Sequence, residues 1–383
     1  MGALVPVTAP IFLGSEIYRG STYGTWHPLR IPRVSSVIDL CRAMGWLSAA
    51  QYRQSPRAKP KALTAWHDPL YIEALIRAEE TQDVDDAIRA RYGLGTVANP
   101  VFPEMYRRPA TGAGGALLAV ELLRAGGVVF HPGGGTHHGM PDRANGFCYL
   151  NDPALAITGL RQQGLTRIAY VDIDAHHPDG VEHGFKGASD VLMISVHEER
   201  RWPFTGALGD DGGGNCLNLP VPRGFHDAEM ALIRDVLILP ALAAFAPEAI
   251  VLQCGADAVT DDPLSRLCLS AQSYWDMVAT VQSLRCPRLL VTGGGGYNPW
   301  TVARVWSGIW ATLSRQDIPD RLPKEGEAVL RSLSWAGHSK GKSPPAAWFT
   351  QLHDSQDEIP IRDTIRDRIA LLSTRPAAQG VMP

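Results

Sequence analysis

The sequence lacks the features of a membrane or secreted protein. Within its 383 residues, no apolar run approaches the roughly 20 residues that span a bilayer. The first residues, MGALVPVTAPIFLG, carry neither the basic flank nor the long apolar core of a secretory signal. Pro6 stands where a myristoylation signal requires Ser or Thr. We therefore expect a cytoplasmic protein with no membrane partner.

The sequence also lacks a charge excess and an organised set of cysteines. Its 36 basic and 39 acidic residues leave a formal net charge of −3 without a long basic run, so no specific nucleic-acid binding is expected. The six cysteines show no pairwise spacing, which favours reduced thiols in a cytoplasm. Neither GxGxxG nor GxxxxGK[ST] occurs in the glycine runs GGGTHH and GGGGYNPW, which argues against nucleotide binding there.

What the chain does contain is an alternation of short apolar runs and helical patterns. The runs, rich in Val and Ile, indicate buried strands at residues 127–130, 168–173, 191–196, 249–253 and 289–292. Helical periodicity occurs at residues 35–44, 69–80, 115–124, 153–162, 227–245 and 361–372. This alternation predicts an α/β domain with a parallel sheet covered on both faces.

The expected organisation is one catalytic domain with an extension. Residues 1–314 form the domain in this interpretation, because the apolar runs lie within them and no linker precedes residue 114. From about residue 315 the chain becomes polar and rich in proline before its last amphipathic stretch. We interpret residues 315–383 as an extension packed on the domain, with a mobile end.

A polar cluster follows each apolar run. In chain order these clusters are HPGGGTHH, DIDAHH, SVHEE, QCGAD and GGGGY. Ligands of open α/β sheets bind in the crevice outside the carboxyl ends of the strands. We therefore expect the five clusters to converge on one site.

The strongest chemical signal is the segment YVDIDAHH. Side chains at alternating strand positions point to one side, so Asp172, Asp174 and His176 would lie together and repel unless a cation compensates them. Asp257, at the end of another apolar run, would add a carboxylate. Such a mixed oxygen and nitrogen site suits zinc or ferrous iron better than calcium or magnesium.

Two further signals concern proton transfer and charge stabilisation. His137 and His138 follow a glycine-rich turn, and Asp172 and Asp179 could orient their rings. Tyr297 follows four glycines and could donate a hydrogen bond to a developing oxyanion. Taken alone, His137 and His138 would more simply be structural histidines, and Tyr297 would fit a buried core position equally well.

Several segments together resemble the histone deacetylase family. They are HHG with GFCYLNDPALAI, YVDIDAHHPDGVE, SVH, QCGADAVTDDPL and GGGGYNPWTVARVW, in the family order between residues 23 and 312. The resemblance implies an arginase-like three-layer α/β fold with a mainly parallel central sheet of about eight strands. It also implies an enzyme that removes acyl groups from amines.

Matching the motifs residue by residue implies a full set of roles. The implied zinc ligands are Asp174, His176 and Asp257. The implied catalytic residues are His137 paired with Asp172, His138 paired with Asp179, and Tyr297. The implied substrate tunnel comprises Gly146, Phe147, Trp202, Phe204, Leu264 and Gly295, and Arg33 matches the channel for acetate release. The implied potassium site comprises the side chains of Asp172 and Ser195 with backbone carbonyls at Asp174, His176 and Val196.

The sequence departs from the family pattern at two points. Pro178 replaces the first glycine of HHGDG, which stiffens the turn that carries Asp179. Ala98 stands where many members carry a rim aspartate that grips a peptide substrate. Asp179 and Tyr297 are typical of the class I and bacterial acetoin-utilisation branches.

We therefore expect an amidohydrolase that uses one zinc or ferrous ion per chain and removes an acyl group, most simply acetyl, from a primary amine such as a lysine side chain. An acetylpolyamine or other small-molecule deacylase of the same family is an alternative. Alternatives of other classes are a two-manganese ureohydrolase and a non-catalytic protein that binds acylated amines.

Overall fold

A computed structural model describes residues 9–24, 26–335, 344–355 and 358–383. In these residues the centre of the molecule is one sheet of eight strands, ordered β2-β1-β3-β8-β7-β4-β5-β6, and every neighbouring pair is parallel. The strands are β1 (Ile11–Gly14), β2 (Tyr52–Gln54), β3 (Gly127–His131), β4 (Ile168–Asp172), β5 (Val191–Glu198), β6 (Cys216–Val221), β7 (Ala249–Gln253) and β8 (Arg288–Thr292).

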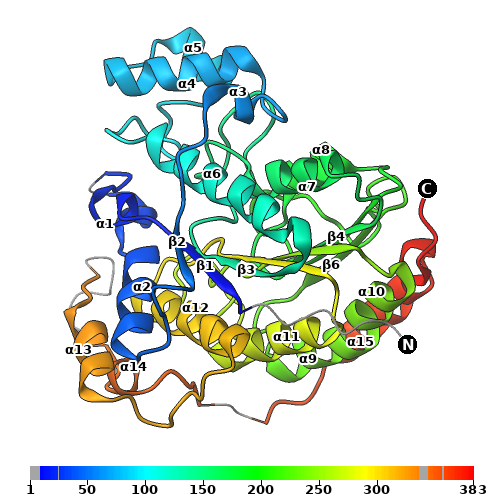
Figure 1. The fold of residues 1–383 in the computed structure, drawn as a ribbon. Coiled ribbons are helices and arrows are strands. Elements are labelled where there is room, and N and C mark those ends of the chain that lie inside the picture. The colour runs from blue at the N-terminus through cyan, green and yellow to red at the C-terminus, as the bar shows by residue number, and fades with distance from the viewer. Residues whose placement is uncertain (1–8, 25, 336–343, 356–357) are drawn as a thin grey trace.

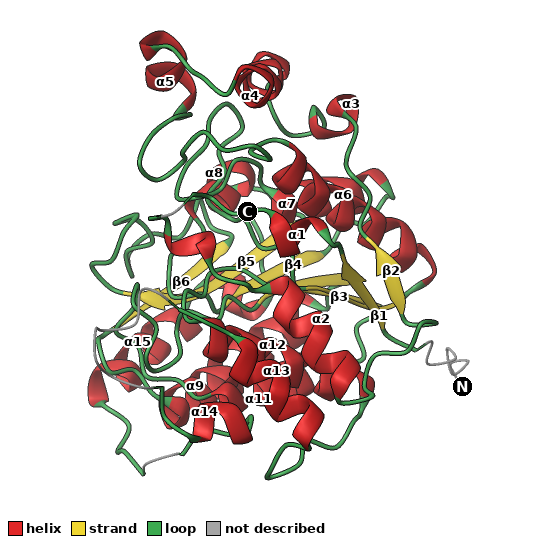
Figure 2. Cartoon of the chain, turned by 90° about the vertical axis from the view of Figure 1, so that its left-hand side faces the viewer, coloured by secondary structure: helices red, strands yellow, loops and turns green. Residues whose placement is uncertain are grey.

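Helices cover both faces of this sheet. The helices of the described residues are α1 (Ile17–Gly20), α2 (Val34–Ala43), α3 (Pro60–Leu63), α4 (Pro69–Thr81), α5 (Asp86–Tyr92), α6 (Arg107–Leu122), α7 (Asp152–Gln162), α8 (Asp179–Phe185), α9 (Asp227–Ile233), α10 (Leu239–Phe245), α11 (Ala271–Ser283), α12 (Pro299–Ser314), α13 (Lys324–Ser332), α14 (Ala347–Thr350) and α15 (Asp363–Ser373). Figures 1 and 2 show α6, α7 and α8 on one face, and α2, α9, α11 and α12 on the other. The expected three-layer α/β fold is confirmed.

Side chains alternate between the two faces of the sheet along each strand, so each face has its own apolar core. On β4, Ala169 and Val171 pack with the layer of α2, α11 and α12, whereas Ile168 and Tyr170 pack with the layer of α6, α7 and α8. Because both faces are buried, the strand needs apolar residues at every position and not only at alternate ones. This explains why the central strands appear in the sequence as unbroken apolar runs.

The five predicted strands are β3, β4, β5, β7 and β8, and their bounds agree with the structure within two residues. They are consecutive in the sheet, so their carboxyl ends form one continuous edge. The three strands that the sequence analysis missed lie outside this central group. Two of them, β2 and β6, are the edge strands, and β6 contains Pro220, which is tolerated at an edge but weakens the strand pattern.

The predicted helices are also present, with two differences. The helix predicted at residues 115–124 begins at Arg107, because the small residues of its first half are buried in close packing. The helix predicted at residues 227–245 contains a π-helical turn, η3 (Arg234–Ile238), between α9 and α10. None of the described helices is both long enough and apolar enough to cross a bilayer.

The C-terminal segment packs against the rest of the molecule. Leu330, Trp348 and Ile365 are buried in the same apolar cluster as α2 and α12. At the end that was expected to be mobile, η4 (Pro376–Gln379) lies against α10, and its Ala377 is buried.

Candidate active site

Three of the five polar clusters predicted to converge line one cavity at the carboxyl edge of the sheet, through His138, His176 and Tyr297. QCGAD reaches the same place through Asp257, which lies close to His176, whereas no residue of SVHEE lines the cavity. Its volume is about 500 Å³. The described residues that line it are Gly93, Thr96, Ala98, Asn99, His138, Ala144, Asn145, Gly146, Phe147, His176, Arg201, Trp202, Leu264 and Tyr297. Because β3, β4, β5, β7 and β8 are parallel neighbours, the loops that follow them reach this same edge.

A group of two carboxylates and one imidazole lies at the inner end of the cavity. One potential ligand atom from each of Asp174, His176 and Asp257 falls within 4.8 Å of the others, and all three residues are buried. The Nδ1 atom of His176 is 3.2 Å from Oδ1 of Asp174 and 3.0 Å from Oδ2 of Asp257. This group could bind a metal ion. Within the described part of the chain, no second group of three such residues comes this close together.

The surrounding backbone is shaped to leave room for these carboxylates. A Cβ atom on Gly255 would lie 1.8 Å from Oδ2 of Asp174, and one on Gly295 would lie 2.0 Å from Oδ2 of Asp257. The amide of Gly295 also donates to Oδ2 of Asp174 at 2.7 Å, which orients this carboxylate. The donor set and the glycine cradle therefore fit a metal with mixed oxygen and nitrogen ligands.

The first histidine of the pair is held by a buried carboxylate. Nδ1 of His137 lies 2.8 Å from Oδ2 of Asp172, which also accepts a hydrogen bond from the hydroxyl of Tyr170. Burial opposes a charge on His137, but the carboxylates of Asp172 and Asp174 raise its pKa to about 9. This ring is therefore suited to supply positive charge.

The second histidine differs in its surroundings. Nδ1 of His138 lies 2.7 Å from Oδ1 of Asp179, and Nε2 of His138 is 2.9 Å from Nε2 of His137. Burial and the neighbouring His137 lower the pKa of His138 to about 4. Because Asp179 engages Nδ1, Nε2 is the atom through which His138 can exchange a proton with a ligand.

Tyr297 lies in the same cavity as His138 and His176. Its backbone amide donates to Oδ2 of Asp262 at 2.7 Å, and the next residue, Asn298, caps the start of α12. Burial raises the pKa of the Tyr297 phenol well above its ordinary value. The hydroxyl therefore stays protonated and can donate a hydrogen bond.

Two aromatic side chains form walls of the cavity. They are Phe147 and Trp202, and the ring of Trp202 packs edge-on to His138, with centroids 4.6 Å apart. Residue 146 must be glycine, because a Cβ atom there would lie 2.1 Å from the Trp202 ring. Leu264 also lines this space.

The structure places two of the predicted tunnel residues elsewhere. Phe204 is 75% exposed and is not among the described residues that line the cavity. Its amide donates to the carbonyl of Arg201, which closes a turn over residues 201–204. Gly295 borders a smaller inner cavity and not the tunnel itself.

That inner cavity, of about 40 Å³, adjoins the histidine pair and has room for about one water molecule. Arg33, the predicted channel residue, lines it. The guanidinium donates to the carbonyl of Gly294 and lies 5.0 Å from the centroid of the Trp306 ring. Burial lowers the pKa of Arg33.

The predicted potassium ligands lie at and just after the end of β4 and in the second half of β5. Asp172 and Ser195 are register partners on these neighbouring strands. Val196 follows on β5, and the hydroxyl of Ser195 is 2.8 Å from Nδ1 of His197.

Sequence reasoning missed several residues that position the site. Asn145 donates to Oδ2 of Asp179 at 2.9 Å, Asp262 holds the Tyr297 amide, and Nε2 of Gln253 is 3.0 Å from Nδ1 of His137. Asn145 directly precedes the GFCY segment, and the other two stand in QCGADAVTDDPL. Their closeness to these motifs was the only signal in the sequence that they belong to the site. The contacts themselves could not be predicted, because each one joins residues that are distant in the sequence.

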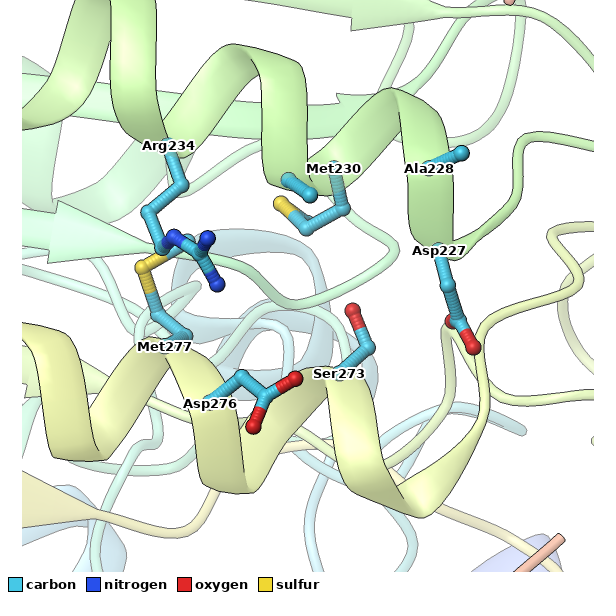
Figure 3. Close-up of a pocket in the computed structure, with 8 residues that line it drawn as sticks. Asp227, Ala228, Met230, Arg234, Ser273, Asp276 and Met277 are labelled. Carbon is cyan, nitrogen blue, oxygen red and sulfur yellow. The ribbon is translucent and has the colours of Figure 1, made fainter. Parts of the chain in front are cut away.

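A second hollow of about 200 Å³ lies between α9 and α11, away from this site. Figure 3 shows Met230 of α9 and Arg234, the first residue of η3, facing Met277, Asp276 and Ser273 of α11. Arg234 pairs with Asp235 at 2.7 Å, and no histidine or cysteine is among the described lining residues. This hollow therefore offers carboxylates but none of the imidazoles that line the larger cavity.

Comparison with known proteins identifies the family. A histone deacetylase domain matches residues 27–313. The chain is 33% identical over 303 residues to histone deacetylase 8 of Xenopus tropicalis, covering 77% of this chain and 81% of that protein. It is 31% identical over 341 residues to the acetoin utilization protein AcuC of Staphylococcus aureus (strain MSSA476), covering 86% of each.

Solved structures agree with this comparison. The chain resembles a crystal structure of an HDAC homolog complexed with SAHA, with a TM-score of 0.90 and 31% identity, covering 96% of this chain and 100% of that one. An HDAC homolog from Aquifex aeolicus gives a TM-score of 0.89 and 32% identity, with the same coverage. The protein belongs to the histone deacetylase family, whose members are deacetylase hydrolases.

Proposed function

We propose that this protein is a zinc-dependent amidohydrolase that removes an acyl group, most simply acetyl, from a primary amine such as a lysine side chain. The observation that carries the proposal is the meeting of a metal-binding group, two His–Asp pairs and a protonated tyrosine around one cavity. The aromatic walls at Phe147 and Trp202 suit the apolar stem of an acylated lysine.

The proposed zinc ligands are Asp174, His176 and Asp257. Zinc bound there would supply Lewis-acid polarisation of the acyl carbonyl and lower the pKa of a coordinated water. His138 accepts a proton at Nε2 from the attacking water and later returns it to the leaving amine.

Two other groups stabilise charge in this mechanism. Tyr297 donates its hydroxyl hydrogen to the oxygen of the former carbonyl as negative charge develops there. His137 remains paired with Asp172 and supplies electrostatic support.

Two ancillary features complete the proposal. Arg33, beside the inner cavity, lies where it could attract the released carboxylate. The side chains of Asp172 and Ser195, with the carbonyls of Asp174, His176 and Val196, are the proposed potassium ligands.

Metal analysis combined with an acetyl-lysine peptide assay tests this function. We expect one zinc or iron per chain, hydrolysis of the reporter, and inhibition by a hydroxamate. Two metals per chain would favour a ureohydrolase, and a metal-loaded protein without turnover would favour a binding protein; either result would reject the proposal.

The assignment of the two histidines has its own comparison. His138→Ala should lose more activity than His137→Ala, because only His138 is assigned the proton transfers. Equal losses in kcat, at equal metal content, would contradict this division of roles.

A further inference from the structure

The cavity is lined by one positively charged side chain. Of the described residues that line it, Arg201 is the only lysine or arginine, and none is an aspartate or glutamate. The carboxylates of the metal-binding group and of the His–Asp pairs are not among these lining residues. A ligand therefore meets a guanidinium at this wall without a competing carboxylate on the lining surface.

This guanidinium is held in place from behind. Nε and Nη2 of Arg201 donate to the two carboxylate oxygens of Glu198, at 2.8 and 2.9 Å. Glu198 is only 7% exposed, and its Oε2 also accepts the amide of Arg266 at 3.0 Å. Nη1 of Arg201 takes part in neither of these two hydrogen bonds to Glu198. Because the guanidinium is already held in one orientation, binding a ligand through Nη1 costs less conformational entropy.

The position of Arg201 connects it to the reacting end of a substrate. The next residue, Trp202, packs on His138, and Phe147 lines the same cavity. A lysine-like stem lying between these walls would place its acyl group near His138 and Tyr297. The opposite end of that ligand would then emerge beside Arg201.

We propose that Arg201 is a specificity-determining residue that favours acylated amines with a carboxylate at the end opposite the acyl group. An Nε-acyl-lysine with a free α-carboxylate has this chemistry, either as a small molecule or as the last residue of a peptide. A polyamine has ammonium groups at the same place and is disfavoured. This inference rests on the proposed deacylase function.

The test compares acids with their neutral amides under identical conditions. The small-molecule pair is Nα-benzoyl-Nε-acetyl-lysine and its carboxamide, and the peptide pair is one sequence ending in acetyl-lysine, as the acid and as the amide. We expect kcat/KM to be about tenfold higher for the acid, mainly through a lower KM, because an interaction outside the reacting centre contributes mostly to binding. A preference in only the small or only the peptide pair identifies the source of the carboxylate.

Variants separate Arg201 from general electrostatics. Arg201→Met should reduce the acid-to-amide ratio to about one, while Arg201→Lys should give an intermediate ratio. Because Arg201→Met leaves Glu198 buried without its partner, the double variant Glu198→Gln/Arg201→Met removes both charges and should show the same loss. Arg200→Gln is the matched control, since the neighbouring Arg200 is exposed and does not line the cavity.

The outcomes distinguish the role of Arg201 from the proposed deacylase function. Hydrolysis of acid and amide at equal kcat/KM by the wild-type protein would overturn the role of Arg201 and leave the deacylase function intact. The role of Arg201 would also be overturned if the acid-to-amide ratio of kcat/KM stayed unchanged in Arg201→Met, or if it fell by the same amount in Arg200→Gln. Hydrolysis of neither compound by the metal-loaded protein would overturn the proposed function and this inference together.

Discussion

At the scale of single residues, Tyr297 is fixed through its backbone and not through its reactive atom. Asp262 holds its amide and Asn298 begins α12 directly after it. The phenol can therefore be altered without loosening the chain around it. This arrangement makes a conservative substitution informative about chemistry.

Tyr297→Phe is expected to lower kcat by about 100-fold or more, the usual cost of losing one oxyanion donor. The metal content should stay at the wild-type value, because the phenol is not among the proposed ligands. Steady-state kinetics and metal analysis of the same preparation check both parts. Wild-type kcat in the variant would remove the phenol from the mechanism.

Ala98 controls a different property, the grip on a peptide backbone. It lines the cavity, where the family resemblance places an aspartate in many members. Ala98→Asp should raise kcat/KM for long peptides more than for small acylated amines, because a carboxylate there can accept hydrogen bonds from peptide amides. In the wild-type protein, simple acyl-lysine reporters should be turned over about as well as long peptides.

The neighbouring residue supplies the control for this change. Val97 is 97% exposed and does not line the cavity, so Val97→Asp adds the same charge without the same contact. An equal gain from Val97→Asp would assign the effect to charge alone. A strong preference of the wild-type protein for one peptide sequence would show that another rim group recognises the backbone.

At the scale of elements, the predictable part of the molecule is the group of strands buried on both faces. Their unbroken apolar runs and the polar residues after them indicated both the sheet and the edge where the site lies. β6 was not recognised because Pro220 weakens its strand pattern, although proline is tolerated in an edge strand. The helix α6 was predicted too short because glycine and alanine carry little helical periodicity, and tertiary packing forms its first half.

The same distinction applies to the site. Asp174 and His176 follow the same strand, β4, within four residues, so their spacing could be recognised locally. The contact of Asn145 with Asp179, and that of Arg201 with the cavity, depend on loops whose paths the sequence pattern does not determine. Phe204 was placed on the tunnel wall for the same reason, since nothing local indicated the turn that exposes it.

We propose that residues 315–383 are an extension that stabilises the catalytic domain formed by residues 1–314. In the extension, Nε and Nη2 of Arg362, just before α15, donate to the carboxylate of Glu229 on α9, and Nε does so at 2.7 Å. Burial raises the pKa of Glu229, but the hydrogen bonds from Arg362 outweigh it and the pKa is lowered. This pair therefore links the extension to a buried carboxylate.

Arg362→Ala should reduce the free energy of unfolding by about 2 kcal/mol near neutral pH, because Glu229 is left buried without its partner. The folded pKa of Glu229 lies below its ordinary value of 4.5, so the pair contributes stability above that pH and loses it as the pH falls through the folded pKa. The difference between variant and wild type should shrink below about pH 4.

Urea unfolding at several pH values measures this difference. Arg366→Ala is the control, since Arg366 is an exposed residue of the same helix. A loss of stability that is the same at pH 3 and pH 7, or that is equal in the control, would contradict the role assigned to Arg362.

At the scale of the whole molecule, the metal-binding group lowers the stability of the folded state when no ion is bound. The group formed by Asp174, His176 and Asp257 lies buried at the edge of the central sheet, between its two helical layers. Two carboxylates held this close repel each other and lose hydration, and a bound cation offsets both effects. Metal binding to the folded state should therefore stabilise the entire domain and not only the cavity.

Removing the metal with a chelator should lower the Tm by about 4 °C or more, since a tightly bound ligand contributes several kcal/mol to stability. Asp257→Asn should abolish most of this response, because it deletes one of the proposed ligands. Asp261→Asn is the matched control: this residue is exposed, and its left-handed backbone, with φ of 70°, also suits asparagine. Differential scanning calorimetry with and without chelator measures each response. A Tm that does not change on chelation of the wild-type protein, at a metal content shown to fall, would mean that the sheet and its helices hold the three side chains together without help from the ion.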